Sequence, residues 1–143
     1  MENIRGIKPI DDFAYRYKMP IMTIKVEGNK ILLSNLEKIG KALHRDTDEL
    51  HNYFGFTLST TKKKVDNNYY IQGKVELSEL QKKLYEYIEY FVLCDKCKLP
   101  ETLYKVDDKN SELKKNCAAC GSTSSINHKF SKNVLKNNLK NEK

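Results

Sequence analysis

The chain has 143 residues, 39% of them hydrophobic, which is enough for one ordinary domain or two small ones. Its 26 basic and 19 acidic residues give a net charge of +7, which favours an anionic partner, with nucleic acid or ribosome ahead of membrane. No apolar run approaches the roughly 20 residues of a membrane span, so we expect a soluble protein. The excess of lysine over arginine is equally consistent with a genome rich in A and T.

The N-terminal part of the sequence predicts an arm followed by a hairpin. Residues 1–19 are expected to form a flexible N-terminal arm, because the first 14 residues show no periodicity. Apolar and polar residues then alternate over 20–26, a pattern typical of a strand. A turn at 27–30 is expected to return the chain as a second, more buried strand over 31–34.

Two short helices and two further strands are predicted next. Asn35 is a candidate N-cap for the first helix, and Asp46 resembles the start of a capping box for the second. Gly55 is expected to end the second helix. Alternating residues over 56–60 predict a third strand, and a turn leads to a fourth over 69–72.

The longest periodic element is an amphipathic helix predicted over 76–92, which should cover one face of the four-stranded sheet. The expected fold class is therefore α+β, a small four-stranded sheet with helices on one side, followed by a four-cysteine zinc ribbon. Residues 20–92 are assigned to the α/β domain and 93–130 to a three-stranded ribbon with few large apolar side chains. Residues 131–143 form a Lys/Asn-rich tail, in which Ser131 is a candidate cap for a last short helix.

Cysteine occurs at only four positions, spaced as CxxC, nineteen residues and CxxC: Cys94, Cys97, Cys117 and Cys120. Each CxxC turn presents two thiolates, and a hairpin between the turns brings them together around one structural Zn²⁺. Gly121 fits the end of such a turn, because glycine accepts a positive φ. Two disulfides are the alternative, disfavoured because no signal peptide opens the chain. Four thiolates leave no open position for substrate, so the metal is expected to be structural.

Aromatic and basic residues alternate just before the first predicted strand, in Phe13-Ala14-Tyr15-Arg16-Tyr17-Lys18-Met19-Pro20. Pro20 biases Met19 to an extended conformation, which would project the segment away from the sheet. In one interpretation the aromatic residues anchor the arm to the core and Arg16 is solvated. In the other, Arg16 offers its guanidinium fork to an anion of a partner. On composition alone the two interpretations are even.

Several short motifs accompany this order of arm, α/β unit, long helix and ribbon: Tyr15-Arg16-Tyr17-Lys18-Met19-Pro20, Lys25-Val26-Glu27-Gly28, Ala42-Leu43-His44-Arg45, Tyr53-Phe54-Gly55-Phe56, Phe91-Val92-Leu93-Cys94, Pro100-Glu101-Thr102 and Cys117-Ala118-Ala119-Cys120-Gly121. From about Phe13 to Asn137 the chain resembles the N-terminal domain of eukaryotic translation initiation factor 5. The sheet and ribbon are shared with the beta subunit of initiation factor 2. The Arg-Tyr-Lys arm is therefore the discriminating motif.

The resemblance implies a factor that is not itself an enzyme but promotes GTP hydrolysis by initiation factor 2. Arg16 occupies the place of the family's proposed arginine finger, acting in trans, and Lys30 matches a lysine that supports activation. Tyr15, Tyr17 and Lys18 would contact the partner, the gamma subunit of initiation factor 2 with its GTP. The other implied partners are the small ribosomal subunit and the initiator tRNA complex. A monomeric, cytoplasmic protein is expected.

A second function is left open, a non-catalytic ribosome-binding module that modulates start-codon selection without activating the GTPase. A component like the beta subunit of initiation factor 2 is disfavoured, because fewer than 15 residues precede the arm motif. The family's C-terminal helical-repeat domain has no counterpart in these residues. Without that second contact, the effective concentration at the target is expected to fall.

Overall fold

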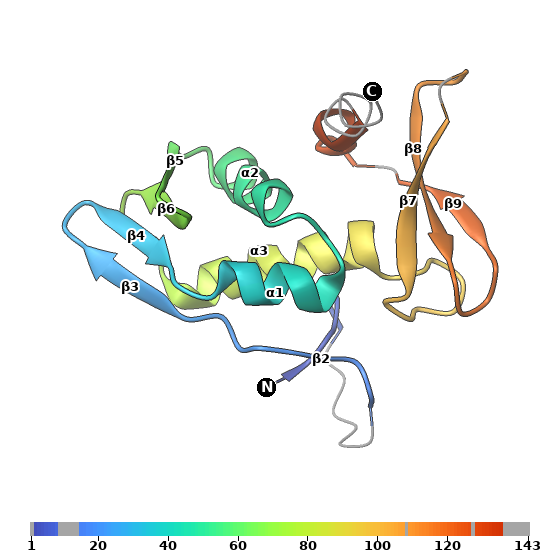
Figure 1. Cartoon of the computed structure of the whole chain (residues 1–143), viewed down its shortest axis with the longest axis horizontal. Coiled ribbons are helices and arrows are strands. Elements are labelled where there is room, and N and C mark those ends of the chain that lie inside the picture. Colours follow the sequence, from blue (N-terminus) through green and yellow to red (C-terminus); the bar gives the residue numbers. More distant parts are fainter. Residues whose placement is uncertain (1, 9–14, 108, 127, 136–143) are drawn as a thin grey trace. The chain divides into compact units, whose positions relative to one another are not determined.

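The protein is represented by a computed structural model that describes residues 2–8, 15–107, 109–126 and 128–135. The chain divides into two compact units, Met1–Glu86 and Tyr87–Lys143 (Figure 1). Small antiparallel sheets and helices build both units, which confirms the predicted α+β class. The division falls within the long helix, whereas the sequence analysis placed it after Val92. No helix in the described ranges is long and apolar enough to cross a membrane.

A four-stranded antiparallel sheet forms the frame of the first unit. β3 (Ile24–Glu27) and β4 (Lys30–Leu33) make one hairpin, and β5 (Lys62–Val65) and β6 (Asn68–Gln72) make another. β4 pairs with β6, so the strand order is β3-β4-β6-β5. The central strands supply the buried side chains at alternate positions: Ile31, Leu33, Tyr69 and Ile71.

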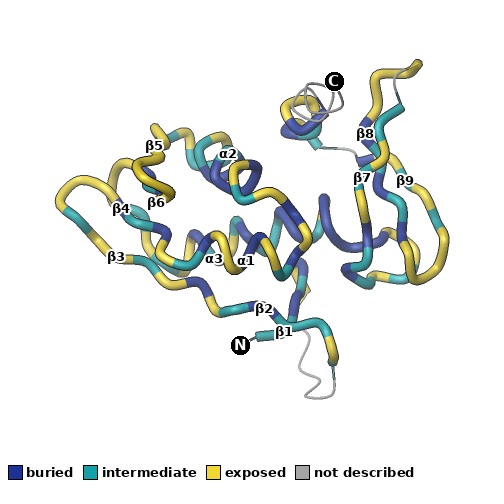
Figure 2. Tube along the Cα trace, viewed as in Figure 1, coloured by how far each residue is buried: buried dark blue, intermediate teal, exposed yellow. Residues whose placement is uncertain are grey.

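Three helices supply most of the remaining core of this unit. They are α1 (Leu36–Leu43), α2 (Thr47–Thr57) and α3 (Leu77–Tyr87). Each has an apolar stripe at helical spacing, and Figure 2 shows buried residues recurring along all three. The fully or almost fully buried apolar residues of these stripes in the first unit are Leu36, Ile39, Leu43, Leu50, Tyr53, Phe54, Leu80 and Leu84.

Helix α2 is longer than predicted, and it replaces the start of the strand expected over 56–60. Gly55 stays helical, and the residue with positive φ at the end of this helix is Ser59, at 51°. A Cβ on Gly55 would stand 3.3 Å from the side chain of Lys62, so the glycine permits a close approach of helix and strand. The predicted third strand is therefore wrong in its position: Phe56 is helical, and the strand begins at Lys62.

The described part of the N-terminal arm contains a short two-stranded sheet. β1 (Glu2–Asn3) pairs antiparallel with β2 (Lys18–Met19). The amide of Ile4 extends the pairing by donating to the carbonyl oxygen of Tyr17 at 2.9 Å. Ile4 and Met19 are buried, with exposed fractions of 3% and 0%. The sequence predicted a flexible arm and gave no sign of this pairing.

The second unit begins at the end of the long helix and continues into the ribbon. Helix α3 passes into a wider, π-helical turn, η1 (Ile88–Val92), which ends just before the first cysteine. The ribbon consists of β7 (Thr102–Asp107), β8 (Glu112–Cys117) and β9 (Thr123–Ser125), in the order β7-β8-β9. A last helix begins at Ser131. The three predicted ribbon strands are thus present, with their ends shifted by a few residues.

A buried histidine joins α2 to the sheet of the first unit. The Nε2 atom of His51 lies 2.8 Å from the carbonyl oxygen of Tyr70, so this nitrogen carries the proton and donates it. Burial lowers the pKa of His51, and the nearby Lys62 and Lys64 act in the same direction. The hydrogen bond to Tyr70 and the charge of Asp48 oppose the shift without reversing it.

We expect the free energy of unfolding to fall as the pH is lowered through about 6.5, the ordinary pKa of histidine. The unfolded chain then takes up a proton that the folded protein resists at His51, which costs at most about 1.4 kcal/mol per pH unit. Urea unfolding between pH 7 and pH 5 measures this slope. His51→Gln, whose amide can also donate to Tyr70, should have a smaller slope. An identical slope in both proteins would contradict the assignment.

Candidate metal centre and N-terminal arm

Two turns of similar geometry present the four cysteines: Cys94, Cys97, Cys117 and Cys120. In each turn the amide after the second cysteine donates back to the carbonyl oxygen of the first. Lys98 donates to Cys94 at 2.9 Å, and Gly121 donates to Cys117 at 2.8 Å. Lys98 and Gly121 both have positive φ, 65° and 77°. The prediction for Gly121 is confirmed, whereas Lys98 adopts this conformation at a cost of roughly 1 kcal/mol.

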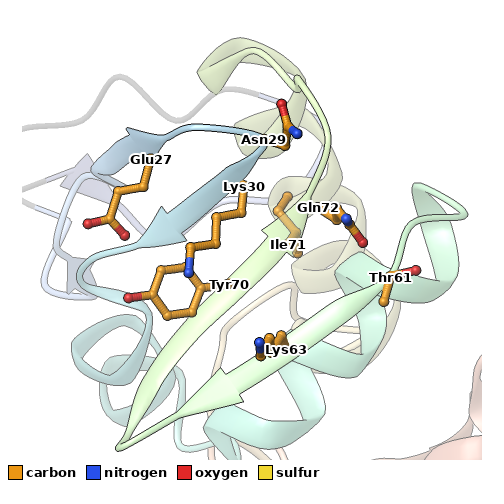
Figure 3. A pocket seen from close by; sticks show the side chains of 8 residues that line it. All are labelled: Glu27, Asn29, Lys30, Thr61, Lys63, Tyr70, Ile71 and Gln72. Carbon is orange, nitrogen blue, oxygen red and sulfur yellow. The ribbon is translucent and has the colours of Figure 1, made fainter.

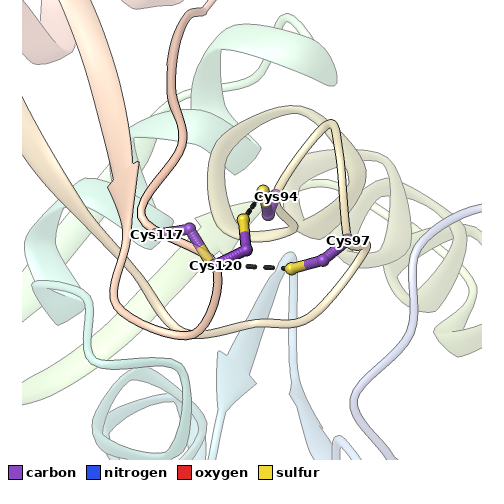
Figure 4. A group of neighbouring side chains, drawn as sticks. All are labelled: Cys94, Cys97, Cys117 and Cys120. Carbon is purple, nitrogen blue, oxygen red and sulfur yellow. Dashed lines mark hydrogen bonds between the residues drawn. The ribbon is translucent and has the colours of Figure 1, made fainter.

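The four sulfur atoms lie within 4.8 Å of one another (Figure 4). Each close pair takes one sulfur from each turn: Cys94 to Cys120 at 3.6 Å and Cys97 to Cys117 at 3.6 Å. A disulfide needs about 2.05 Å, so the alternative of two disulfides does not fit. Sulfurs bound at about 2.3 Å to a tetrahedral ion stand about 3.8 Å apart. The cluster therefore fits one metal ion held by four thiolates.

Nearby donors favour the ionised form of these sulfurs. The side chain and amide of Ser122 hydrogen-bond to Cys120 and lower its pKa to about 6. The amide of Lys96 lies 3.4 Å from the Sγ atom of Cys94. Because metal ions bind the thiolate and not the thiol, such hydrogen bonds prepare the cluster for a cation.

A buried lysine braces the first cysteine turn. The side chain of Lys115, in β8, is 1% exposed, and its Nζ atom lies 2.9 Å from Oδ1 of Asp95. The same Nζ donates to the carbonyl oxygen of Tyr90 at 3.1 Å. Asp95 is the residue after Cys94, so one ammonium group connects the ribbon strand, the π-helical turn and the metal-binding turn. The sequence analysis missed this contact, because a lysine in a polar strand carries no local sign of burial.

Asp95→Ala is expected to destabilise the second unit by about 1–3 kcal/mol, because it leaves a buried ammonium with one fewer partner. Lys115→Met is expected to cost less, since it removes the buried charge and keeps an apolar stem of similar length. Denaturant unfolding of the metal-loaded protein compares the two variants. A more harmful Lys115→Met would show that the charge itself, and not its pairing, stabilises the turn.

Arg16 lies on the surface immediately before Tyr17 and β2. Its Cζ atom stands 4.9 Å from the centre of the Tyr17 ring, and one of its nitrogens donates to the Tyr17 hydroxyl at 2.8 Å. Tyr15 meets the Tyr17 ring edge-on, with 5.4 Å between the ring centres. The structure therefore holds the guanidinium at the surface, on an aromatic side chain. The predicted anchor Phe13 lies outside the described residues.

The other predicted site residues have different surroundings. Lys18 hydrogen-bonds through its Nζ atom to the Asn3 side chain, within the N-terminal sheet. Lys30 begins β4, and its Nζ atom lies 4.4 Å from the centre of the Tyr70 ring. Figure 3 shows Lys30 beside Tyr70, both lining a cavity of about 310 Å³ with Glu27 and Lys63 among the other lining residues. In Figure 1 the β3–β4 turn lies well away from β2, so the structure does not bring Lys30 to Arg16.

The fold and the cysteine cluster define a class of protein, an α/β unit with an N-terminal arm followed by a four-cysteine ribbon. Comparison with known families identifies the class further. A family model, described as a domain found in initiation factors 2B and 5, matches residues 8–123. The chain belongs to this family, and the resemblance found in the sequence is confirmed.

The most informative relatives are named eukaryotic translation initiation factor 5. The factor of Saccharomyces cerevisiae is 40% identical over 134 residues, covering 88% of this chain and 33% of the relative. The factor of Mus musculus is 37% identical over 138 residues, with coverages of 91% and 32%. The factor of Drosophila melanogaster is 32% identical over 145 residues, with coverages of 96% and 31%. The chain thus spans about a third of the length of the curated relatives it matches.

Proposed function

We propose that the protein is a translation initiation factor that promotes GTP hydrolysis by initiation factor 2 on the small ribosomal subunit. Arg16 acts as an arginine finger in trans, towards the GTP held by the gamma subunit. The observation that carries the proposal is the surface position of this guanidinium on the Tyr17 ring. The protein is not the GTPase itself. It acts as a monomer in the cytoplasm, next to the initiator tRNA complex.

The chemistry of phosphoryl transfer gives the arginine its role. Negative charge spreads over the transferring group and the leaving oxygen in the transition state. A guanidinium offers two parallel donors to phosphate oxygens, which the point charge of a lysine does not. Stacking on Tyr17 restricts the Arg16 side chain before the partner arrives, which lowers the entropy lost on binding. Tyr15 and Tyr17 contribute the aromatic surface that meets the gamma subunit and excludes water.

Lys30 supports activation from a separate place in this proposal. Its ammonium lies over Tyr70 at the end of the β3–β4 hairpin, apart from the arm. It therefore contacts a second part of the partner complex and does not share the phosphate with Arg16. Lys18 has a partly internal role, because its side chain also links β2 to Asn3.

The four cysteines would hold one Zn²⁺, with a structural role. Four sulfur ligands at tetrahedral spacing are the preferred set for a structural zinc site and leave no position for a substrate. When bound, the ion would link the turn after η1 to the turn after β8. The ribbon strands would then be fixed at one end by the metal and at the other by their own pairing.

The test of the proposed function is GTP hydrolysis in initiation complexes reconstituted from purified initiation factor 2, initiator tRNA and small ribosomal subunits. Adding the protein should accelerate the release of phosphate in a saturable manner. Complexes without the small subunit should respond much less, because the proposal places the reaction on the ribosome. Hydrolysis that is the same with and without the protein would refute the activator function.

A second candidate function is the non-catalytic ribosome-binding module, and the exposed lysines favour it. The edge strand β5 carries three consecutive exposed lysines, Lys62, Lys63 and Lys64. In the ribbon, Lys105 and Lys109 line a cavity of about 570 Å³. In this function the protein binds complexes without accelerating hydrolysis. Phosphate contacts predict that its affinity for ribosomal RNA falls steeply with added salt, and a flat response would refute them.

A further inference from the structure

The N-terminal strand connects helix α3 to the segment that carries Arg16. We infer that Tyr85 is a positioning residue for Arg16: it docks β1, and β1 in turn fixes β2 and the residues beside it. The inference deepens the proposed function and rests on it for the consequence in GTP hydrolysis. The docking itself is a property of the free protein and can be measured without any partner.

Tyr85 contacts the strand through two different groups. Its hydroxyl donates to Oε1 of Glu2 at 2.5 Å, and the Cζ atom of Arg5 stands 4.0 Å from the centre of its ring. A carboxylate and a guanidinium on either side of Asn3 and Ile4 thus meet one aromatic side chain. Burial and the neighbouring Glu2 raise the pKa of Tyr85 to about 12, so the phenol remains a donor at neutral pH.

The strand passes this position on to the arm. Ile4 is buried, and its amide donates to the carbonyl oxygen of Tyr17 at 2.9 Å. Asn3 pairs with Lys18 in register, and their side chains are hydrogen-bonded as well. Tyr17 is the residue on which the Arg16 guanidinium lies. A continuous series of contacts therefore leads from Tyr85 through β1 to Arg16.

The docking matters because β1 and β2 are too short to pair stably alone. Two paired strands without a further packing surface are at best marginally stable in water. Tyr85 and the burial of Ile4 and Met19 supply that surface. If β1 detaches, Arg16 occupies its active position for only a fraction of the time. Activity at saturation then falls by that same fraction.

The experiment uses the full chain with its native N-terminus and any purification tag at the C-terminus. Tyr85→Leu removes the hydroxyl and the ring, whereas Tyr85→Phe keeps the ring for Arg5 and loses the hydroxyl. The matched control is Tyr90→Leu, which removes an exposed tyrosine of η1 in the second unit. Three quantities are measured: the exchange rate of the Ile4 amide by NMR, the thermal unfolding midpoint, and GTP hydrolysis against protein concentration.

Tyr85→Leu should speed exchange of the Ile4 amide and lower the saturating rate of GTP hydrolysis, each by about tenfold. The half-saturating concentration should change little, and Tyr85→Phe should lie between Tyr85→Leu and the wild type. A loss of folded protein alone would raise the half-saturating concentration and leave the saturating rate intact, which would overturn the inference. Unchanged Ile4 exchange in Tyr85→Leu would also overturn it.

Arg16→Ala is assayed in parallel to separate this inference from the proposed function. If Arg16→Ala hydrolyses GTP at the wild-type rate, the proposed function fails, and the exchange of Ile4 still decides whether Tyr85 docks the strand. If Arg16→Ala is impaired while Tyr85→Leu opens the strand without losing activity, the positioning role is refuted and the arginine finger stands.

Discussion

Cys117→Ser is expected to abolish stoichiometric Zn²⁺ binding and to unfold the three-stranded sheet of the ribbon. Structural zinc contributes about 10–16 kcal/mol to folding in zinc-finger peptides at pH 7, and a serine hydroxyl does not replace a thiolate ligand. Cys117 is the last residue of β8 and is 1% exposed, so the central strand loses its anchor. Zinc content per chain and amide exchange at Leu113 measure the two effects.

The matched control is Ala118→Ser, which places the same hydroxyl one position later on an exposed residue. It should retain one zinc ion per chain and wild-type exchange in β8. A strong chelator added to the wild type should reproduce Cys117→Ser, while the amide of Ile71 in the first unit keeps its protection, because the two units are separately compact. Full protection of β8 without metal would show that the ribbon folds on its apolar core alone.

Arg16→Ala is expected to lower the rate of GTP hydrolysis in reconstituted initiation complexes by at least about 10³-fold. At 1.36 kcal/mol per factor of ten, this is about 4 kcal/mol of lost transition-state stabilisation. The half-saturating concentration should change little, since the guanidinium matters most when charge develops on the phosphate. Single-turnover measurements of phosphate release separate the chemical step from binding.

Two variants show whether the fork or only the charge is required. Arg16→Lys keeps the charge but loses the two parallel donors and the planar stack on Tyr17, so it should recover only part of the rate. Lys25→Ala removes one positive charge from an exposed strand position and should leave the rate unchanged. Equal losses in Lys25→Ala and Arg16→Ala would assign the effect to net charge and refute the arginine finger.

Local patterns predicted the parts of the structure that depend on neighbours in the sequence. The cysteine spacing was sufficient to predict the cluster, because each CxxC turn is a local structure and the hairpin between them is short. The second hairpin was predictable for a similar reason: Asp66 and Asn67 both adopt positive φ, at 49° and 70°. Aspartate and asparagine tolerate that conformation better than most residues.

Caps and helix ends were predicted less well, because tertiary contacts compete with local ones. Asn35 occupies the predicted N-cap position, but its side chain makes no cap hydrogen bond. Its amide instead donates to the carbonyl oxygen of Ile21 at 2.8 Å and accepts from the amide of Thr23 at 3.0 Å. Gly55 was likewise taken for a helix end, whereas its role is to let Lys62 approach. In both cases a partner distant in sequence decided the outcome.

The contacts that brace the candidate sites were beyond the sequence altogether. Lys115 reaches a carbonyl oxygen 25 residues away, and Tyr85 reaches a carboxylate 83 residues away. A polar residue that is buried by a distant partner has the same local pattern as one that is solvated. Periodicity and spacing therefore predicted the sulfur cluster and the exposed arginine, but not the residues that hold them in place.

The long separation between Glu2 and Tyr85 has a consequence for the nascent chain. At about 5–20 residues per second, a ribosome adds the 83 residues between the two partners in roughly 4–17 s. During that interval the amino terminus has left the peptidyl transferase centre but has no tyrosine to bind. An unfinished polypeptide therefore does not display its arm in the mature arrangement, and the arrangement is completed only when the helix that closes the first unit has been synthesised.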